Sequence, residues 1–298
     1  MLIAASASLV AQSVVLGLLL GGLYALLAAG LTLYFGIMRV VMVAHAAFLL
    51  LAGYLAWYAH TRSGIDPLLT IPVLVPLFYV LGYVLQRVLL ARLRPATLTT
   101  MSVLLTFGVA LGIEGALGWA WTGAQRRIQL GYSGSSWELL GVQVAVVKAI
   151  AFGLAVAALT ALWAILRFTR FGRALRATMQ HPEAARLVGI DTGAVAARGF
   201  GLGLATAAVG GVALSLDATI YPSLHWHWIG PLMAIIVVGG LGSVPGAGIA
   251  ALVLGLSQSV LQVWFGTTWA QTVFYIALFL TLMLKPNGFF GGRLAQRF

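Results

Sequence analysis

Long apolar runs with almost no charged residue follow one another along nearly the whole chain. A helix of about 20 apolar residues crosses a bilayer, and within lipid only helices and closed barrels satisfy their own backbone hydrogen bonds. We therefore predict an all-α polytopic membrane protein with about eight to nine transmembrane or re-entrant helices. The runs cover about residues 9–35, 40–59, 67–91, 97–122, 143–166, 198–219, 229–243, 245–264 and 267–284.

The run 229–243 is the least certain crossing, because it is short for a bilayer. Gly230 and Pro231 lie near its start, and the turn GGLGSVPG follows it. A broken or re-entrant helix and a complete crossing are both compatible with this pattern.

The composition excludes the other common classes of protein. Only 8% of the residues are charged and 61% are hydrophobic, whereas about a quarter of the residues of a soluble domain are charged. The net charge of +11 does not indicate a nucleic-acid partner, because the basic residues lie at the ends of apolar runs and not on one solvated face. The chain has no cysteine, so disulfides and thiolate metal sites are excluded.

The basic residues also predict an orientation. Cytoplasmic loops of membrane proteins are enriched in Lys and Arg. With the N-terminus outside, 13 of the 17 basic residues are cytoplasmic, which predicts an N-out/C-in topology. The cytoplasmic set is Arg39, Arg87, Arg92, Arg94, Arg167, Arg170, Arg173, Arg176, Arg186, Arg198, Lys285, Arg293 and Arg297, and the outer set is Arg62, Arg126, Arg127 and Lys148.

The longest predicted cytoplasmic segment, about 167–198, combines a basic flank with a short helix. Four arginines recur every three residues from Arg167 to Arg176, which places them on one helical flank, where they can meet anionic lipid headgroups. Pro182 is suited to the first position of a new helix, with Glu183 in its first turn and Gly189 at its end. This short helix is either a plug for a groove in another protein or part of a solvated connection.

Motifs of catalysis are missing from the sequence. Neither Lys148 nor Lys285 follows the glycine-rich turn of a nucleotide-binding loop. The sequence contains no HExxH, no GxSxG and no pair of intramembrane aspartates. We therefore expect a non-catalytic chain without cofactor or metal.

A few polar and glycine residues within the runs are candidates for lining a translocation path. Glu114 either faces an aqueous cavity or locks two helices through a neighbouring Ser, Trp or Arg. His45 is either an interhelical hydrogen-bonding residue or part of a path. Gly239, Gly240 and Gly242 form the predicted helix break, which is suited to line a path, although most glycines here are expected to serve helix packing.

Outer-side charges are candidates for docking a second protein. Arg126 and Arg127 lie in the longest outer loop, and Asp217 opens the aromatic stretch DATIYPSLHWHWIGP. Arg126 and Arg127 can meet acidic residues of a partner or serve only to solubilise the loop.

Four stretches together resemble a known family. They are GLLLGGLYALLAAGLTLYFGIMRVVMVAHAAFLLLAGYLAW, TRFGRALRATMQHPEAARLVGID, MAIIVVGGLGSVPGAGIAALVLG and LMLKPNGFFG. In this order they resemble the permeases of branched-chain amino-acid ABC importers, and specifically the shorter, H-type subunit. The chain departs from the family around His45, where it reads VMVAHAAF and lacks the polar and acidic residues that are typical there.

The resemblance implies the architecture and partners of such an importer. Residues 1–298 are then one transmembrane domain of the inner membrane, paired with an M-type permease and served by two cytoplasmic ATPase subunits and a periplasmic solute-binding protein. ATP hydrolysis belongs to the partner chains. The resemblance maps the ATPase-coupling loop onto Pro182, Glu183, Ala184, Ala185, Arg186 and Gly189.

The solute stays open at this point. A branched-chain or other amino acid is the first expectation, and urea, an amide or an aromatic acid is the alternative. A stand-alone secondary carrier would need a buried proton relay, for which Glu114 and His45 are a thin basis.

Overall fold

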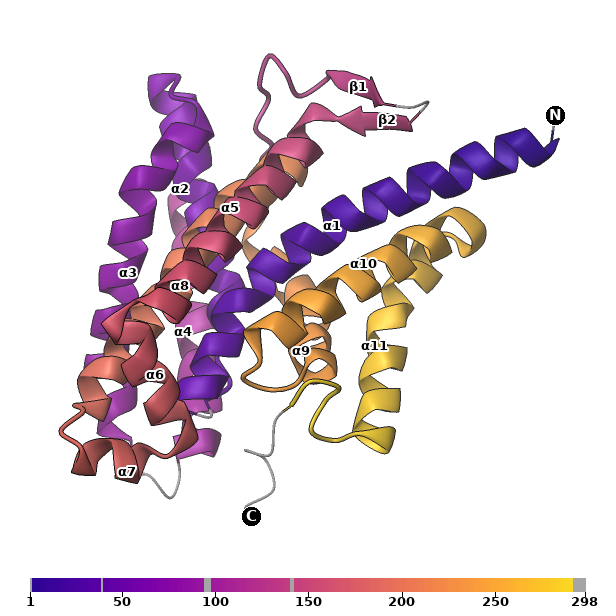
Figure 1. Ribbon diagram of the computed structural model, residues 1–298. Coiled ribbons are helices and arrows are strands. Elements are labelled where there is room, and N and C mark those ends of the chain that lie inside the picture. The colour runs from indigo at the N-terminus through magenta and orange to yellow at the C-terminus, as the bar shows by residue number, and fades with distance from the viewer. Residues whose placement is uncertain (1, 39, 94–97, 140–141, 292–298) are drawn as a thin grey trace.

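The computed structural model describes residues 2–38, 40–93, 98–139 and 142–291, and the described chain is almost entirely helical (Figure 1). Short 3-10 turns flank two of the helices: η1 (Pro67–Thr70) and η2 (Leu90–Arg92) lie on either side of α3, and η4 (Pro222–Leu224) precedes α9. The α-helices are α1 (Leu2–Met38), α2 (His45–Ser63), α3 (Ile71–Val88), α4 (Leu98–Trp121), α5 (Val146–Phe168), α6 (Arg170–Gln180), α7 (Pro182–Leu187), α8 (Thr192–Asp217), α9 (His225–Gly239), α10 (Val244–Phe265) and α11 (Thr267–Leu284).

The membrane fold predicted from the apolar runs is confirmed in seven helices. Among the described residues, α1, α3 with its flanking turns, α4, α5, α8, α10 and α11 are long and apolar enough to cross a membrane. The two remaining runs correspond to α2, which carries His60 and Arg62 in its last turn, and to the 15-residue α9. At about 1.5 Å per residue α9 is roughly 22 Å long, which is less than a bilayer core.

The expectation of an all-α chain is wrong in one loop. Between α4 and α5, β1 (Ser136–Leu139) pairs with the antiparallel strand β2 (Val142–Ala145), and Trp137 lies opposite Val144. Val142 and Val144 are buried while Gln143 is exposed, and this alternation is the pattern of a half-buried strand.

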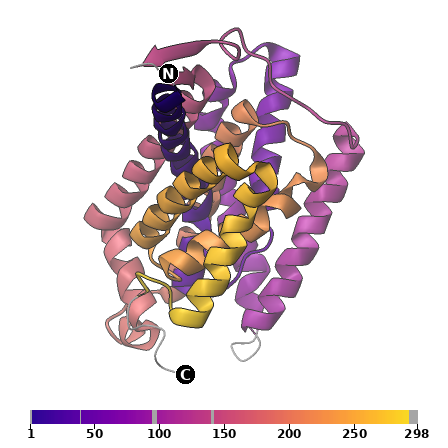
Figure 2. The ribbon, with the colours of Figure 1, turned by 90° about the vertical axis from the view of Figure 1, so that its right-hand side faces the viewer.

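The helices have two clearly different ends. The start of α1 and the β1–β2 hairpin lie at one end of the bundle, and α6 and α7 lie at the other (Figure 1). We call these the hairpin end and the α6–α7 end. In Figure 2, turned by 90°, α10 and α11 face the viewer and α11 descends toward the α6–α7 end.

Helix α8 forms the centre of the bundle. In its most apolar window 89% of the residues are buried, compared with 17% in α3, α5 and α11. Glycines permit this position, because a Cβ on Gly82 of α3 would lie 2.9 Å from the Cα of Gly201 in α8. Small residues let backbones approach closely in membrane helices.

Helices α1 and α10 pack in the same way. A Cβ on Gly255 would lie 2.6 Å from the Cα of Gly21, and one on Gly17 would lie 2.8 Å from the Cα of Leu256. The predicted packing role of these glycines is confirmed, since a larger side chain at either position requires the helices to separate.

Candidate functional site

The α6–α7 segment begins with a capped helix on the end of α5. Thr169 adopts an extended conformation and its Oγ1 accepts a 3.0 Å hydrogen bond from the Gly172 amide. This is the geometry of a helix N-cap. Helix α6 therefore turns away directly from the end of α5, without a flexible link between the two helices.

The predicted break between α6 and α7 is confirmed. His181 is extended, with φ −145° and ψ 90°, and Pro182 is at the start of α7. The residue before a proline is driven out of the helical region, whereas proline itself is favoured in a first turn. Glu183 lies in that first turn, where the positive end of the helix favours a carboxylate.

Gly189 ends α7 in the left-handed conformation, with φ +83°. The Gly189 amide donates to the Arg186 carbonyl and the Ile190 amide donates to the Ala185 carbonyl, both at 3.0 Å. These two bonds are the Schellman motif. The predicted bounds of the short helix, Pro182 and Gly189, are thus confirmed with the physical cause expected of each.

Side-chain contacts hold α7 against the start of α8. Arg186 donates from Nε to the Thr192 hydroxyl at 2.8 Å. Asp191 caps α8 by accepting from the Ala194 amide at 2.9 Å, and this hydrogen bond, with a second one from Gly193, holds the pKa of the Asp191 carboxyl below its ordinary value. The turn is therefore a defined shape built from short-range contacts.

The two alanines that the resemblance maps onto the coupling loop differ in exposure. Ala185 is buried within the chain, at 3% exposure, whereas Ala184 is exposed. Leu187 and Val188, which sequence reasoning missed, are 89% and 76% exposed. At 100° per residue, Leu187 lies about 160° and Ala184 about 100° away from Ala185 around the helix axis. Val188 is the C-cap residue that follows α7, so the helical period alone predicts only that Leu187 faces away from Ala185.

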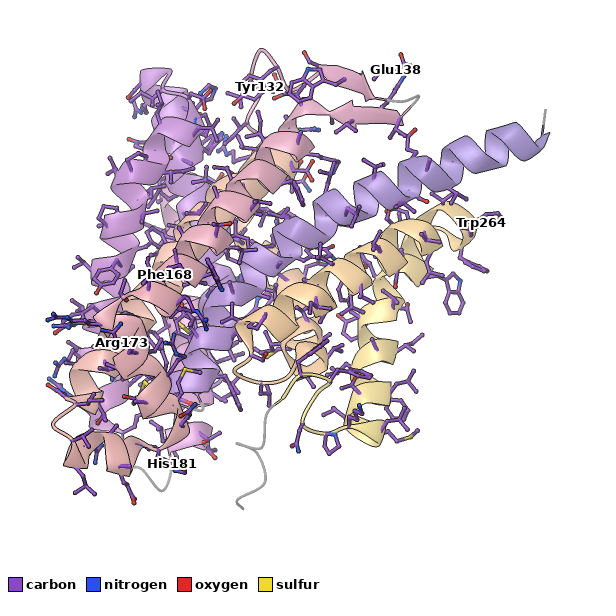
Figure 3. All side chains as sticks on the ribbon, in the orientation of Figure 1. Tyr132, Glu138, Phe168, Arg173, His181 and Trp264 are labelled. Carbon is purple, nitrogen blue, oxygen red and sulfur yellow. The ribbon has the colours of Figure 1, made fainter. Side chains whose placement is uncertain are left out.

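Basic side chains surround this segment. Arg167, Arg170, Arg173, Arg176 and Arg186 are exposed. Among the described residues no carboxylate lies within ion-pair distance of any of them. Figure 3 labels Arg173 and His181 at this end, opposite Tyr132 and Glu138 at the hairpin end. Arg39, Arg94, Arg293 and Arg297 of the predicted cytoplasmic set lie outside the described residues.

His45 is enclosed within the protein. It is 1% exposed, its Nε2 lies 2.8 Å from the Leu27 carbonyl of α1, and its ring packs edge-on against Tyr34. A carbonyl can only accept, so Nε2 carries the proton. This is the interhelical hydrogen bond that the sequence offered as the alternative to a path residue.

Glu114 joins α4 to α9. Its carboxylate accepts a 3.0 Å hydrogen bond from the Trp226 indole N–H, and the His225 Nε2 lies 3.8 Å away. Its side chain is 26% exposed, so the same carboxylate both locks two helices and remains open at the surface of the chain. The geometry is therefore compatible with both hypotheses from the sequence, a contact that locks two helices and a carboxylate that faces an aqueous cavity.

The helix break after α9 is a tight glycine turn. Gly240 and Gly242 have φ of +98° and +84°, and the Ser243 amide donates to the Gly240 carbonyl at 3.0 Å. Gly239 ends α9 and packs against the start of α10, where a Cβ would lie 2.5 Å from the Ala247 nitrogen. The predicted break is therefore confirmed, and its glycines meet turn and packing requirements.

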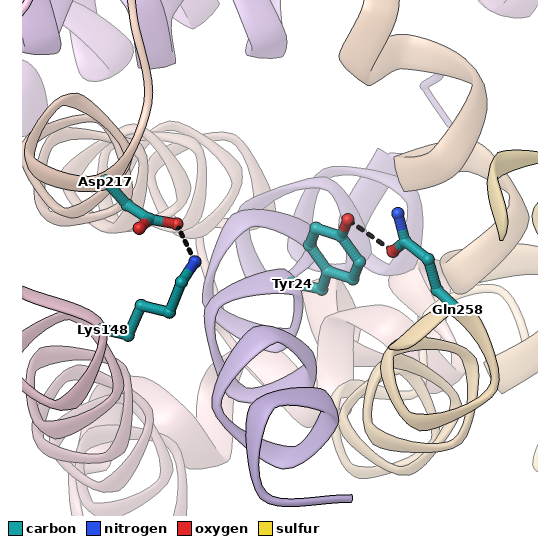
Figure 4. Close-up of polar contacts among 4 residues, drawn as sticks. All are labelled: Tyr24, Lys148, Asp217 and Gln258. Carbon is teal, nitrogen blue, oxygen red and sulfur yellow. Dashed lines mark hydrogen bonds and ion pairs between the residues drawn. The ribbon is translucent and has the colours of Figure 1, made fainter. Parts of the chain in front are cut away.

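The three residues predicted to dock a second protein differ in whether their charged groups contact the chain itself. Asp217 pairs with Lys148 of α5 at 2.8 Å (Figure 4). Arg126 lies 4.9 Å over the Trp57 ring and donates to the Trp121 carbonyl. Arg127 is exposed, and it is the one of the three for which the described residues provide no such contact.

A second polar contact in Figure 4 was not singled out in the sequence. The Tyr24 hydroxyl of α1 donates to the Gln258 side-chain carbonyl of α10 at 2.7 Å. This hydrogen bond joins α1 to α10.

In the described part of the chain, no group of three or more His, Asp or Glu side chains is arranged to hold a metal ion.

Comparison with known proteins gives a consistent result over the whole chain. Residues 13–283 match the family described as "Branched-chain amino acid transport system / permease component". The chain is 28% identical to the high-affinity branched-chain amino acid transport system permease protein LivH of Escherichia coli K12 over 290 residues, covering 92% of this chain and 93% of that protein.

Two further relatives come from other organisms. The permease protein BraD of Pseudomonas aeruginosa is 26% identical, covering 94% of this chain and 95% of BraD. A probable LivH of Methanocaldococcus jannaschii is 27% identical, covering 90% and 89%. No solved structure matches. The match over residues 13–283 agrees with the apolar helices and with the capped α6–α7 segment. The chain therefore belongs to the family of permease components of branched-chain amino acid transport systems.

Proposed function

We propose that the chain is one permease half of an ATP-driven importer in the bacterial inner membrane, and that residues 1–298 form a single transmembrane domain. It pairs with a related permease subunit, and ATP is hydrolysed by two ATPase subunits on the cytoplasmic side. A periplasmic binding protein delivers the solute. The chain itself has no catalytic step, because its task is to change the accessibility of a path.

The α6–α7 segment is the observation that carries this proposal. It lies at one end of the bundle (Figure 1), its backbone is fixed by the cap at Thr169 and the Schellman motif at Gly189, and it exposes Leu187 and Val188. Exposed apolar side chains on a rigid polar segment are typical of a protein contact. We assign this segment, with Glu183 and Arg186 beside the apolar pair, as the surface that docks in a groove of the ATPase.

The proposed topology has the hairpin end outside and the α6–α7 end inside. It is supported by the exposed arginines of α5 to α7, since Lys and Arg favour the cytoplasmic side. In this arrangement α2 and α9 complete nine membrane segments. Among the outer candidates, we propose Arg127 as the residue that meets the binding protein, because Arg126 and Asp217 have partners within the chain.

The proposed solute is a branched-chain or related amino acid, in line with the names of the relatives. Of the path candidates, Glu114 is favoured over His45, because a carboxylate with 26% exposure can contact water or a second permease, whereas His45 is enclosed. Ionisable groups at membrane depth usually face an aqueous cavity or another helix.

Reconstitution in liposomes tests the proposal. The chain, its partner permease, the ATPases and the binding protein are expected to accumulate leucine or valine only with ATP. The variant Glu183→Lys is expected to lose both uptake and co-purification of the ATPase. Glu138→Lys is the matched control, because Glu138 is exposed at the hairpin end, and it is expected to retain the ATPase.

Two results would contradict the proposal. The first is flux driven by a proton gradient through this chain alone, without nucleotide, which indicates a secondary carrier. The second is full uptake and ATPase binding in Glu183→Lys.

A further inference from the structure

A cavity of about 830 Å³ lies at the α6–α7 end, between α1, α5, α6 and the start of α10. Its size is within the range of small-molecule pockets, roughly 300–1,000 Å³. The wall is mainly apolar and includes Leu33 of α1, Leu159 and Trp163 of α5 and Leu175 of α6. A wall of this kind recognises hydrocarbon more favourably than polar groups.

Positive charge lines the same cavity. Arg167 from the last turn of α5 and Arg176 from α6 are both lining residues, and the lining contains no Asp or Glu among the described residues. Arg176 donates to the Leu166 carbonyl, which keeps its guanidinium beside the end of α5. The first turn of α10, with Val244 and Pro245, also contributes to the wall and adds the positive end of a helix dipole.

We propose that this cavity binds one anionic phospholipid, with its phosphate between Arg167 and Arg176 and part of an acyl chain against Leu33 and Leu159. Charge complementarity selects this ligand: two guanidinium groups without carboxylate partners recognise a phosphate, and the apolar wall recognises hydrocarbon. Trp163 is exposed beside Arg167, which is typical of aromatic residues at a membrane interface.

The bound lipid connects the bundle to the α6–α7 segment. Arg176 lies on α6 and Gly248 on α10, so one lipid contacts both the segment that leads into α7 and the transmembrane helix opposite it. The lipid is thereby placed to set the position of α6 relative to the bundle. Binding itself requires only that the α6–α7 end meets a leaflet, and does not depend on transport.

Native mass spectrometry of the purified permease complex, equilibrated with mixed phosphatidylglycerol and phosphatidylcholine, tests the site. The variant Arg167→Gln with Arg176→Gln is expected to retain about 25-fold less phosphatidylglycerol, which corresponds to ~2 kcal/mol for two basic groups. The matched control is Arg173→Gln, since Arg173 is exposed on α6 but does not line the cavity; it is expected to leave retention within about twofold.

A second variant tests the acyl chain. A Cβ on Gly248 meets no atom within 4 Å, and Gly248 lines the cavity, so Gly248→Leu places hydrocarbon in the cavity and is expected to lower phosphatidylglycerol retention. Gly153 on α5 is equally open and lies outside the lining, so Gly153→Leu is the control.

A photoreactive residue at position 159 identifies the occupant directly. The expected product is the chain with the added mass of one phospholipid. Three results would overturn the proposal: cross-linking to a second polypeptide instead of lipid, equal retention of phosphatidylcholine, or equal loss of lipid in Arg173→Gln and in the double variant.

Discussion

The two ends of the bundle use their positive charges differently. At the hairpin end Lys148 pairs with Asp217 and Arg126 lies over Trp57, so these charges fix the chain's own structure. At the α6–α7 end five arginines from Arg167 to Arg186 are exposed and, among the described residues, form no ion pair.

This difference indicates that the α6–α7 end is where the molecule has surface available for partners. A charge engaged within the chain stabilises the fold, whereas an exposed, unpaired charge contributes little to stability and remains available to lipid or protein. The α6–α7 end therefore combines a rigid backbone with exposed apolar side chains and with exposed arginines, two of which, Arg176 and Arg186, also donate hydrogen bonds within the chain. That combination is expected of a docking element, whereas at the hairpin end Lys148 and Arg126 contact other side chains of the chain itself.

The largest effect is expected from Leu187→Asp combined with Val188→Asp. Burial of two such side chains in an interface is worth roughly 3 kcal/mol or more, so the affinity for the ATPase is expected to fall more than about 100-fold. Both residues are largely exposed in the chain, so its thermal stability is expected to stay unchanged. Co-purification and thermal unfolding are the two measurements. If the double variant also lowered the thermal stability of the chain, Leu187 and Val188 would be needed for the fold and not for docking.

Gly189→Val is expected to rank second. A β-branched residue is strained at φ +83°, at a cost of roughly 1–3 kcal/mol, and relief of the strain distorts the turn after α7. ATP-dependent uptake is expected to fall about tenfold, while Gly134→Val in the turn before β1, where φ is ordinary and no atom lies near, is expected to be neutral. Equal uptake in both variants would show that the turn has no role in coupling.

At the hairpin end, Asp217→Asn is expected to lower the free energy of unfolding by up to about 1 kcal/mol, because the Lys148–Asp217 pair is partly exposed and screened. Arg173→Gln at the other end is expected to change it by less than about 0.5 kcal/mol. Denaturant titration in detergent measures both. A larger loss in Arg173→Gln would reverse the comparison of the two ends.

The smallest effect concerns Asp191, whose pKa is lowered by amide hydrogen bonds from Ala194 and Gly193. A carboxyl with a lowered pKa in the folded state adds stability above its unfolded pKa, near pH 4, and loses it as the pH falls through the folded value. Asp191→Asn keeps a capping oxygen. The wild-type chain is therefore expected to be more stable than this variant at pH 6, with the difference shrinking below pH 4. A constant difference across this range would contradict the assignment.

Much of the fold can be predicted from the pattern of apolar runs, prolines and glycines in the sequence. Each predicted apolar run coincides with a helix, and Pro182 and Gly189 bound α7 because proline and left-handed glycine act locally. The enclosure of His45 was not predictable, because its partner, the Leu27 carbonyl, lies 18 residues away on another helix. The β1–β2 hairpin was missed because its strands are four residues each.

The candidate site was predictable in its position and not in its orientation. The position of α7 follows from its end signals, but the burial of Ala185 and the exposure of Leu187 depend on how α7 packs against its neighbours. The cavity beside Arg167 and Arg176 is lined by α1, by the consecutive helices α5 and α6, by the turn that leads into α10 and by the residues after α11, so no local signal marks it.

The chain's lack of cysteine makes site-specific cross-linking the most direct test of the docking surface. Leu187→Cys, at the exposed tip of α7, and Ser135→Cys, in the exposed loop before β1, are each treated with a bifunctional thiol reagent in the assembled complex. A product is expected between position 187 and the ATPase subunit, and none is expected from position 135. An ATPase product from position 135, or its absence from position 187 in a complex that hydrolyses ATP, would contradict it.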